Sequence, residues 1–553
     1  MNRVDADWRA VVDGYWEKLL TLEPVLATEV GDERFDDRLA DPSEAGRDRR
    51  EQVQRGALKD LEAIDRSRLD LVGRTTLDVM EAIAVRDLAA LEHRTDRFQV
   101  VSHLWGPGTL LADLGSLQRA DTPERRDRYF ARLSAVPAYL EACAEVAADA
   151  ARVGQTVPVV VIERTIAQIE RLVKLSFGDA PLATPLREAS EAERDRFAGL
   201  MREVLWPAYH RFLDALRAYR PHARESLGLC ALPNGEEMYA AEIRAWTTLE
   251  MEPGRVHEMG VEDLERIQEE RRRIARALGY SDPEAAVQAH QASGRNTAGS
   301  REEVVRLAEE QVLRGWEAAP RFFGRMPRAN CEVRPIEEYR EADMPFAFYQ
   351  GPTQDGERPG VYYVNTSDLP ERPLHHLATT TYHEANPGHH FQVSIEQEMG
   401  ERPLLRRFGG ILAGSAFIEG WGLYSERLAD EMGLFLDDYE RLGMLDAQAF
   451  RAVRLVVDTG IHAFGWDRER AIEKMMATGA PRLDSGIEVD RYISLPGQAL
   501  SYKIGQFEIE RWRADAEKRA GGSFSLRDFH DRLLAVGSLP LEAVARELGS
   551  DSP

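Results

Sequence analysis

The chain has 553 residues, with 71 Lys and Arg residues against 95 Asp and Glu residues, so its formal net charge is −24. A surface this acidic repels phosphate backbones, which excludes nucleic acid as an expected partner. The hydrophobic fraction of 43% and the charged fraction of 30% are typical of an ordinary globular protein.

Helical patterns predominate along the chain. The segment 190–219 begins with a capping box, Ser190-Glu-Ala-Glu193, and a kink is expected at Pro207. A flexible break near 288–299 divides the chain into an N-terminal helical region, 1–299, and a C-terminal region, 300–553. The segments with apolar residues at helical spacing are 8–24, 50–95, 122–150, 160–175, 190–219, 253–278, 300–319, 420–460, 467–478 and 498–520.

Strand patterns are few and lie together. Short aromatic or β-branched runs at 331–336, 345–349 and 360–365 predict one small sheet at about 330–366. A loop at 351–358 links two of these strands. The expected fold class is therefore mainly α, with one small β-sheet directly before the segment that is richest in histidine.

Cysteine usage and hydropathy bear on the location of the chain. The three cysteines, Cys143, Cys230 and Cys331, are far apart and form no CxxC pair, which excludes a disulfide framework and a cysteine zinc site. No apolar run is long enough to span a bilayer, and the N-terminal residues include acids where a signal peptide needs an apolar segment. We therefore expect a cytoplasmic protein without a membrane partner.

Histidines cluster in one short window. Of the 13 histidines in the chain, five lie within residues 375–390, namely His375, His376, His383, His389 and His390. Imidazole is the commonest transition-metal ligand, so this clustering predicts a metal site. His375 and His376 precede the central motif by about two turns and are expected only to flank the site.

The central motif is a variant of the HExxH zinc motif, in which two histidines lie four residues apart on one helix face beside a general-base glutamate. Here His383-Glu384 is intact, but His389 comes six residues after His383, about 120° away on a continuous helix. Pro387 must interrupt the helix expected at about 373–392, and Gly388 lets the chain turn, so that His389 can return to the metal face. His390 is the alternative ligand.

A zinc hydrolase needs three protein ligands and one open position. Glu419 is the expected third ligand, because it follows His389 at a distance that suits a turn and a returning helix. Glu426 lies on the same helix face, and we expect it to orient a ligand or to pair with an arginine. The other His-Glu pair, His257-Glu258, lacks a second histidine and is not expected to bind metal.

Later segments offer groups for catalysis. A zinc peptidase needs a donor to the developing oxyanion, and Tyr502 is the first candidate and His462 the second. Arg491, Lys503 or Arg454 could hold a substrate carboxylate, which would make the enzyme an exopeptidase.

Substrate contacts are also expected from the predicted sheet. The strand at 360–365, with Tyr363 and Asn365, could pair with an extended peptide by edge addition. Gln498, beside a Pro-Gly turn, is a further candidate contact.

Three segments together resemble a known bacterial family. They are His383-Glu-Ala-Asn-Pro-Gly-His-His-Phe-Gln392, Glu419-Gly-Trp-Gly-Leu-Tyr-Ser-Glu426 and Pro496-Gly-Gln-Ala-Leu-Ser-Tyr-Lys-Ile-Gly505. The family is catalogued as "domain of unknown function 885" and is grouped with the gluzincin metallopeptidases, and the resemblance extends over nearly the whole chain. It implies a mostly helical protein whose two regions form one deep cleft, with zinc and a peptidase or carboxypeptidase-like activity. It also implies His383 as a ligand, Glu384 as the base, and His389 and Glu419 as further ligands.

The expected function is that of a zinc-dependent metallopeptidase, carboxypeptidase- or dipeptidase-like, acting on short peptides with one zinc ion per chain. Cobalt or manganese would suit the same ligands. One alternative is a zinc amidase acting on a small non-peptide amide. The other is a helical binding protein whose metal is structural.

Overall fold

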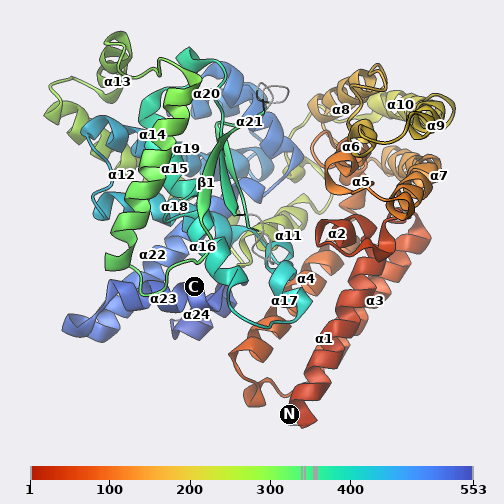
Figure 1. Cartoon of the computed structure of the whole chain (residues 1–553), viewed down its shortest axis with the longest axis horizontal. Coiled ribbons are helices and arrows are strands. Elements are labelled where there is room, and N and C mark those ends of the chain that lie inside the picture. Colours follow the sequence, from red (N-terminus) through yellow and green to blue (C-terminus); the bar gives the residue numbers. More distant parts are fainter. Residues whose placement is uncertain (1–2, 338–340, 342–343, 353–358, 551–553) are drawn as a thin grey trace.

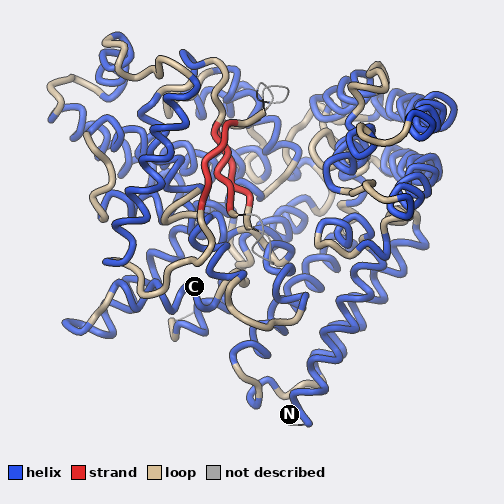
Figure 2. The backbone as a smooth tube through the Cα atoms, in the orientation of Figure 1, coloured by secondary structure: helices blue, strands red, loops and turns tan. Residues whose placement is uncertain are grey.

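The structure is a computed structural model that describes residues 3–337, 341, 344–352 and 359–550. Helices form most of it, and a single small sheet stands out in the middle of the view (Figure 2), which confirms the mainly α class. The first helices are α1 Arg3–Leu22, α2 Pro24–Glu29, α3 Glu44–Glu62, α4 Leu71–Glu92, α5 Asp96–Gln99, α6 Pro107–Leu117, α7 Pro123–Val153, α8 Val159–Leu172, α9 Glu191–Leu200, α10 Trp206–Tyr219 and α11 Gly235–Thr247. The later helices are α12 Pro253–Ala277, α13 Pro283–Ala292, α14 Arg301–Ala318, α15 Leu377–Glu384, α16 His389–Gln397, α17 Leu404–Leu412, α18 Ala416–Glu431, α19 Asp438–His462, α20 Arg468–Met476, α21 Arg482–Ser494, α22 Ser501–Ala520, α23 Leu526–Val536 and α24 Leu541–Leu548.

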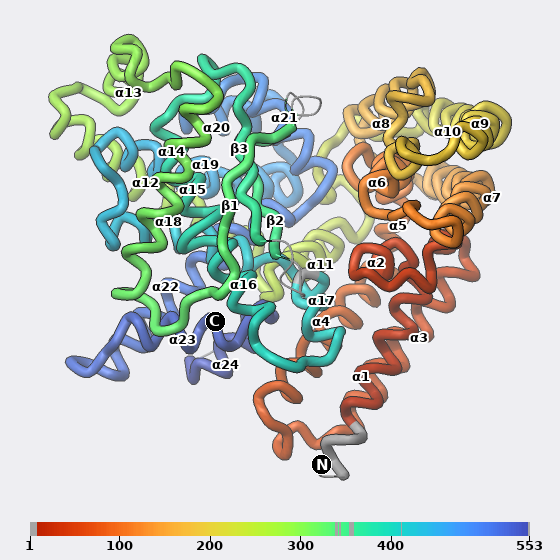
Figure 3. Tube along the Cα trace, in the orientation of Figure 1, coloured from red at the N-terminus to blue at the C-terminus, as the bar shows by residue number. Residues whose placement is uncertain are grey.

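The N-terminal helices up to α10 lie on one side of the molecule, and most helices from α12 onward lie on the other (Figures 1 and 3). One hydrophobic core extends through both sides, because its buried residues range from Trp8 to Leu548. The helices α12 and α13 belong to the predicted region 1–299 but lie with the C-terminal helices (Figure 1), and α12 packs along α19. The predicted boundary at residue 299 therefore does not separate two groups of helices here, because helices from both sides of the boundary pack on α19.

The predicted capping box and kink both lie in the segment 190–219. The Ser190 side chain accepts from the Glu193 backbone N–H, and the Glu193 side chain accepts in return. A single π-helical turn, Met201–Leu205, then separates α9 from α10. The irregularity thus lies before Pro207. Pro207 itself is in the first turn of α10, where a residue without a backbone N–H is tolerated.

The sheet has three strands in the order β1-β3-β2, with β1 at Cys331–Pro335, β2 at Ala347–Gln350 and β3 at Gly360–Val364. Strand β1 is parallel to β3, and β2 is antiparallel to it. The predicted loop at 351–358 lies outside the described residues over 353–358. Tyr362 connects the sheet to α15, because its hydroxyl lies 3.2 Å from Oγ1 of Thr381. The sheet therefore forms a platform against which the predicted zinc motif is held.

Candidate metal centre

The predicted helix around the zinc motif is divided in two. Helix α15 ends at Glu384 and α16 begins at His389, and residues 385–388 leave the helical path. Pro387 cannot donate to the carbonyl of His383, which ends the ladder there. At Gly388 a side chain is excluded by contact, since a Cβ atom would overlap the carbonyl oxygen of His383. The break predicted from Pro387 and Gly388 is therefore present.

Trp421 of α18 holds this break from the opposite side. Its Nε1–H donates to the carbonyl oxygens of Pro387 at 3.0 Å and Gly388 at 3.2 Å. The indole is fully buried, so both carbonyls are satisfied away from water. Sequence reasoning missed Trp421, although its position between Gly420 and Gly422, two residues after Glu419, was a usable signal.

Three predicted ligands converge from three helices. The Nε2 atoms of His383 on α15 and His389 on α16 each lie 3.8 Å from Oε2 of Glu419 on α18. The centres of the two imidazole rings are 4.7 Å apart, and the rings are nearly perpendicular. Two ligand atoms that bind one zinc ion at about 2.0–2.2 Å are about 3.3–3.8 Å apart for angles between tetrahedral and trigonal. The donor set of two imidazoles and one carboxylate thus fits a single zinc ion.

A chain of buried polar groups orients His383. Its Nδ1–H donates to Oε1 of Glu426 at 2.8 Å, which leaves the Nε2 lone pair facing Glu419 and His389. Oε2 of Glu426 accepts from Gln448 at 2.9 Å. This is the arrangement in which an outer carboxylate fixes the tautomer of a metal-binding histidine.

The chain continues beyond Gln448 to α22 and α12. Nζ of Lys503 donates to Oε1 of Gln448 at 2.7 Å and pairs with Asp263 at 2.8 Å. Because Lys503 is fully buried between these partners, the prediction that it could hold a substrate carboxylate is wrong. Neither Gln448 nor Asp263 was predicted from sequence, since no local pattern connects either residue with the zinc motif.

The charges of the centre are strongly coupled. Burial opposes a charge on His383, but the neighbouring carboxylates of Glu419 and Glu426 raise its pKa to about 9. Burial and the neighbouring His383 lower the pKa of His389 to about 4. Burial would raise the pKa of Glu419, yet the neighbouring His383 and His389 lower it to about 2. These shifts favour a second proton on His383, at the Nε2 atom that faces Glu419, when no metal is bound.

Metal binding should therefore release that proton. Between pH 6 and pH 8 the apparent zinc association constant should rise about tenfold per pH unit, because His383 is protonated below its pKa of about 9 and must lose the proton to bind. Calorimetry in buffers of different ionisation enthalpy measures the protons released per ion. The difference between the wild type and His389→Gln isolates this centre, and an affinity that does not change with pH would contradict the assignment of His383.

Glu384 stands next to His383 at the end of α15. Burial raises its pKa to about 7; the charge of His383 opposes the rise, and that of Glu419 adds to it. A carboxylate with a pKa near neutrality is suited to accept a proton and later return it.

Tyr502 belongs to a polar cluster beside Glu419. The guanidinium of Arg454 lies 4.6 Å from the centre of the Tyr502 ring, and the charges of Arg454 and Arg491 both act on the Tyr502 hydroxyl. Arg491 also donates to Oε1 of Gln498 at 2.7 Å. Burial and the charge of Glu419 raise the pKa of Tyr502, so it keeps its proton and remains a donor. The structure thus brings together the predicted residues Tyr502, Arg491 and Gln498.

Two residues proposed for the site from sequence, His462 as an oxyanion donor and His390 as an alternative or outer ligand, have structural roles instead. His462 accepts from the Leu229 N–H at Nδ1 (3.3 Å) and donates from Nε2 to the Tyr492 carbonyl at 2.9 Å. With both ring nitrogens bonded to backbone, the prediction of His462 as an oxyanion donor is wrong. His390 is held in the same way, by the Tyr349 hydroxyl at 2.9 Å and the Ala329 carbonyl at 3.1 Å. His390 therefore anchors α16 to the sheet and does not face the ligands.

The predicted substrate contacts on β3 are also wrong. Strand β3 is the central strand, hydrogen-bonded on both sides, so it offers no free edge to a peptide. The Asn365 amide donates to the carbonyl of Glu341 at 2.6 Å and is buried. Tyr363 stacks on Phe348 at 4.8 Å, on the face opposite to that of Tyr362, which contacts α15.

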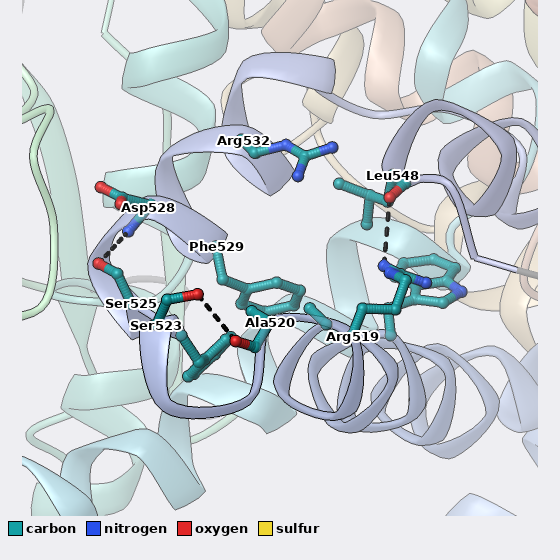
Figure 4. A pocket seen from close by; sticks show the side chains of 11 residues that line it. Arg519, Ala520, Ser523, Ser525, Asp528, Phe529, Arg532 and Leu548 are labelled. Atoms are coloured by element: carbon teal, nitrogen blue, oxygen red, sulfur yellow. Dashed lines mark hydrogen bonds between the residues drawn. The ribbon is translucent and has the colours of Figure 1, made fainter.

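Two cavities in the described part of the chain lie away from these residues. One, of about 290 Å³, is bordered by Trp512, Phe529 and Leu548 of α22, α23 and α24 (Figure 4). The other, of about 630 Å³, borders α3 and α4 near Leu58 and Glu62. Neither includes a predicted site residue, so the deep cleft implied by the resemblance remains a prediction.

Comparison with known proteins shows the family and the fold. Residues 24–548 match the family described as "Bacterial protein of unknown function (DUF885)". A structure titled "The crystal structure of the putative lipoprotein from Colwellia psychrerythraea" has 26% identity and a TM-score of 0.90, and the match covers 99% of each chain. A second, "The structure of a putative lipoprotein of unknown function from Shewanella oneidensis", has 21% identity and a TM-score of 0.79, covering 98% of this chain and 99% of that one. Among curated proteins, none matches significantly.

These relatives correct the expected location. Both titles describe lipoproteins, a description that does not suit a protein of the cytoplasm, so the prediction of a cytoplasmic protein is wrong. Within the described residues, no helix is long and apolar enough to cross a membrane.

Proposed function

The chain belongs to the DUF885 family of bacterial proteins of unknown function, and from its site we propose that it is a zinc-dependent peptidase. The observation that carries the proposal is the convergence of His383, His389 and Glu419 with Glu384 beside them. The ligand set leaves a position for water and substrate, as catalytic zinc sites do. The buried pair of His383 and Glu426 supports a preorganised centre over a surface coincidence.

In the proposed hydrolysis, each residue of the site has a separate role. Zinc bound by the three ligands would supply a Lewis acid that activates water and polarises the scissile carbonyl. Glu384 takes the proton from the attacking water and passes it to the leaving amine. The Tyr502 hydroxyl donates to the oxyanion, and the cation of Arg454 over its ring favours that donation.

Arg454 is the best candidate to bind a substrate carboxylate. Its Nη2 donates to Glu488 at 3.0 Å and its Nε to the Tyr492 hydroxyl at 3.1 Å. Its Nη1 is buried and makes no hydrogen bond to the described residues. A buried donor without a partner beside the candidate centre suits the free C-terminus of a peptide, which favours a carboxypeptidase.

Arg454→Lys should therefore weaken binding of peptides with a free C-terminus. We expect KM for such a peptide to rise about tenfold to a hundredfold, because Lys keeps the charge beside Glu488 but lacks the second donor. The same peptide with an amidated C-terminus, cleaved slowly by the wild type, should be unaffected. Arg441→Lys, a partly exposed arginine on the same helix, is the control. An equal effect on both peptides would argue against carboxylate recognition.

The proposal itself is tested by digesting a library of short peptides with the zinc-loaded protein and identifying the products by mass spectrometry. Stepwise loss of C-terminal residues, abolished by 1,10-phenanthroline and restored by zinc, is the expected result. Products that never form, or that form equally with chelator present, would refute it. The similarity to lipoproteins supports a place of action outside the cytoplasm, which we propose for this chain as well.

A further inference from the structure

A second group of potential ligands lies at the other end of α15. His375 and His376 belong to the short 3-10 helix η10, Leu374–His376, and Asp446 lies on α19. The Nε2 atom of each histidine is 3.5 Å from Oδ2 of Asp446, and the two rings are 4.0 Å apart. Both Nε2 atoms are buried and make no hydrogen bond to the described residues. The catalytic proposal uses none of these groups.

The hydrogen bonds of His375 specify its tautomer. Oδ1 of Asn296 accepts from the backbone N–H of His375 at 3.0 Å and lies 3.0 Å from its Nδ1. An atom that accepts from a backbone N–H is an oxygen, so Nδ1 must carry a hydrogen and donate to it. In a neutral ring, Nε2 then presents its lone pair to Oδ2 of Asp446. Two lone pairs that face each other in a buried place repel, unless a metal ion or a proton lies between them.

The distances suit a metal ion. Ligand atoms at about 2.0–2.1 Å from one zinc ion are about 3.3–3.6 Å apart for angles between tetrahedral and trigonal, and both observed distances to Oδ2 are 3.5 Å. Arg271 pairs with the other oxygen of Asp446 at 2.7 Å, so the carboxylate is turned with Oδ2 toward the histidines. Glu284 lies 3.4 Å from Arg271 and offsets its charge.

The backbone holds these groups together. A Cβ atom at Gly443 would overlap the carbonyl oxygen of His375, so α19 meets η10 by direct backbone contact. Asp446 follows Gly443 by three residues, about one turn, and so lies near the same face. The ligand positions are therefore set by the packing of two elements and do not depend on a mobile loop.

We propose that His375, His376 and Asp446 form a second site for a divalent transition metal, with zinc the ion that their chemistry suits best. The ion joins η10 to α19 and so holds the start of α15, whose opposite end carries His383 and Glu384. His383 follows His375 by eight positions, which places the two sites about 12 Å apart along the helix. The role that we assign is structural, because the ion would join two elements whose backbones are already in direct contact.

The test is the zinc content of the full chain, stripped with a chelator, reloaded with zinc and measured by mass spectrometry against protein concentration. We expect about two ions per chain in the wild type, about one in His389→Gln, about one in Asp446→Asn, and none in the double variant. His376→Ala, whose side chain is partly exposed, is a second route to one ion if Asp446→Asn does not fold. Asp438→Asn, at the exposed start of the same helix, should keep both ions.

The zinc contents of these variants test the two proposed metal sites independently. One ion in the wild type, lost in His389→Gln but kept in Asp446→Asn and His376→Ala, would overturn the second site and leave a His–Asp ion pair in its place. One ion lost in Asp446→Asn and kept in His389→Gln would support the second site and refute the catalytic centre. Thermal unfolding gives a further readout: zinc should raise Tm in His389→Gln and leave it unchanged in the double variant.

Discussion

Glu384→Gln should keep its zinc and lose turnover by about a hundredfold to ten-thousandfold, the contribution usual for a general acid–base. Gln has the shape of Glu but cannot take a proton from water at neutral pH. Glu384 donates no ligand atom to the group of His383, His389 and Glu419, so the ion should remain. Peptide turnover and zinc content measured on the same preparation check both parts of this expectation.

The matched control is Glu258→Gln, because Glu258 also follows a histidine on a helix but is exposed and pairs with Arg255 at the surface. It should leave turnover and zinc unchanged. The wild-type rate should fall as the pH is lowered through the pKa of Glu384, about 7 in the metal-free centre and lower with zinc bound, since only the unprotonated carboxylate accepts a proton. Retained turnover in Glu384→Gln would remove Glu384 from the mechanism.

His389→Gln should lose the ion of the catalytic centre, and His390→Gln should retain it. The two variants carry the same chemical change at neighbouring residues, so their difference reports the direction of the side chain alone. His389 points to Glu419, whereas both ring nitrogens of His390 are engaged by Tyr349 and Ala329. We expect zinc affinity at this centre to fall by more than the tenfold to hundredfold typical of an outer partner in His389→Gln.

His390→Gln is expected to change the stability of the fold and to leave its metal content unchanged. Loss of its two buried hydrogen bonds should lower the free energy of unfolding by about 1–3 kcal/mol while zinc content stays at the wild-type value. Metal analysis together with thermal unfolding separates the two effects. The opposite result, with zinc lost from His390→Gln and kept in His389→Gln, would reverse the assignment of the second ligand.

Much of the metal centre was predictable because its signals are local. Pro387 lacks an N–H in any context, so the helix had to end near His383 whatever surrounded it. The spacing to Glu419 and the helical pattern around it placed a carboxylate on the returning helix, and the same face carried Glu426. The longest helices and the three strands were likewise predicted from periodicity and turn residues. Several shorter helices were not among the predicted segments, including α6, α11, α13, α17, α21, α23 and α24.

Tertiary structure alone decided which groups those elements meet. The same small and aromatic surroundings that suggested catalysis for His462 belong to a core in which backbone groups of Leu229 and Tyr492 satisfy its ring. Lys503 is a plausible carboxylate ligand by residue type, yet folding places it against Asp263, 240 positions earlier in the chain.

The order of the strands was undetermined for the same reason. Three short strands can pair with any one of them in the middle, and only the folded structure shows that β3 is the central strand. His375 and His376 looked like flanking residues because their partner, Asp446, lies on a helix 70 positions away. Backbone propensity and chain breaks act within a few residues, so the sequence reveals them, whereas the partner of a buried polar group is chosen only when distant helices pack.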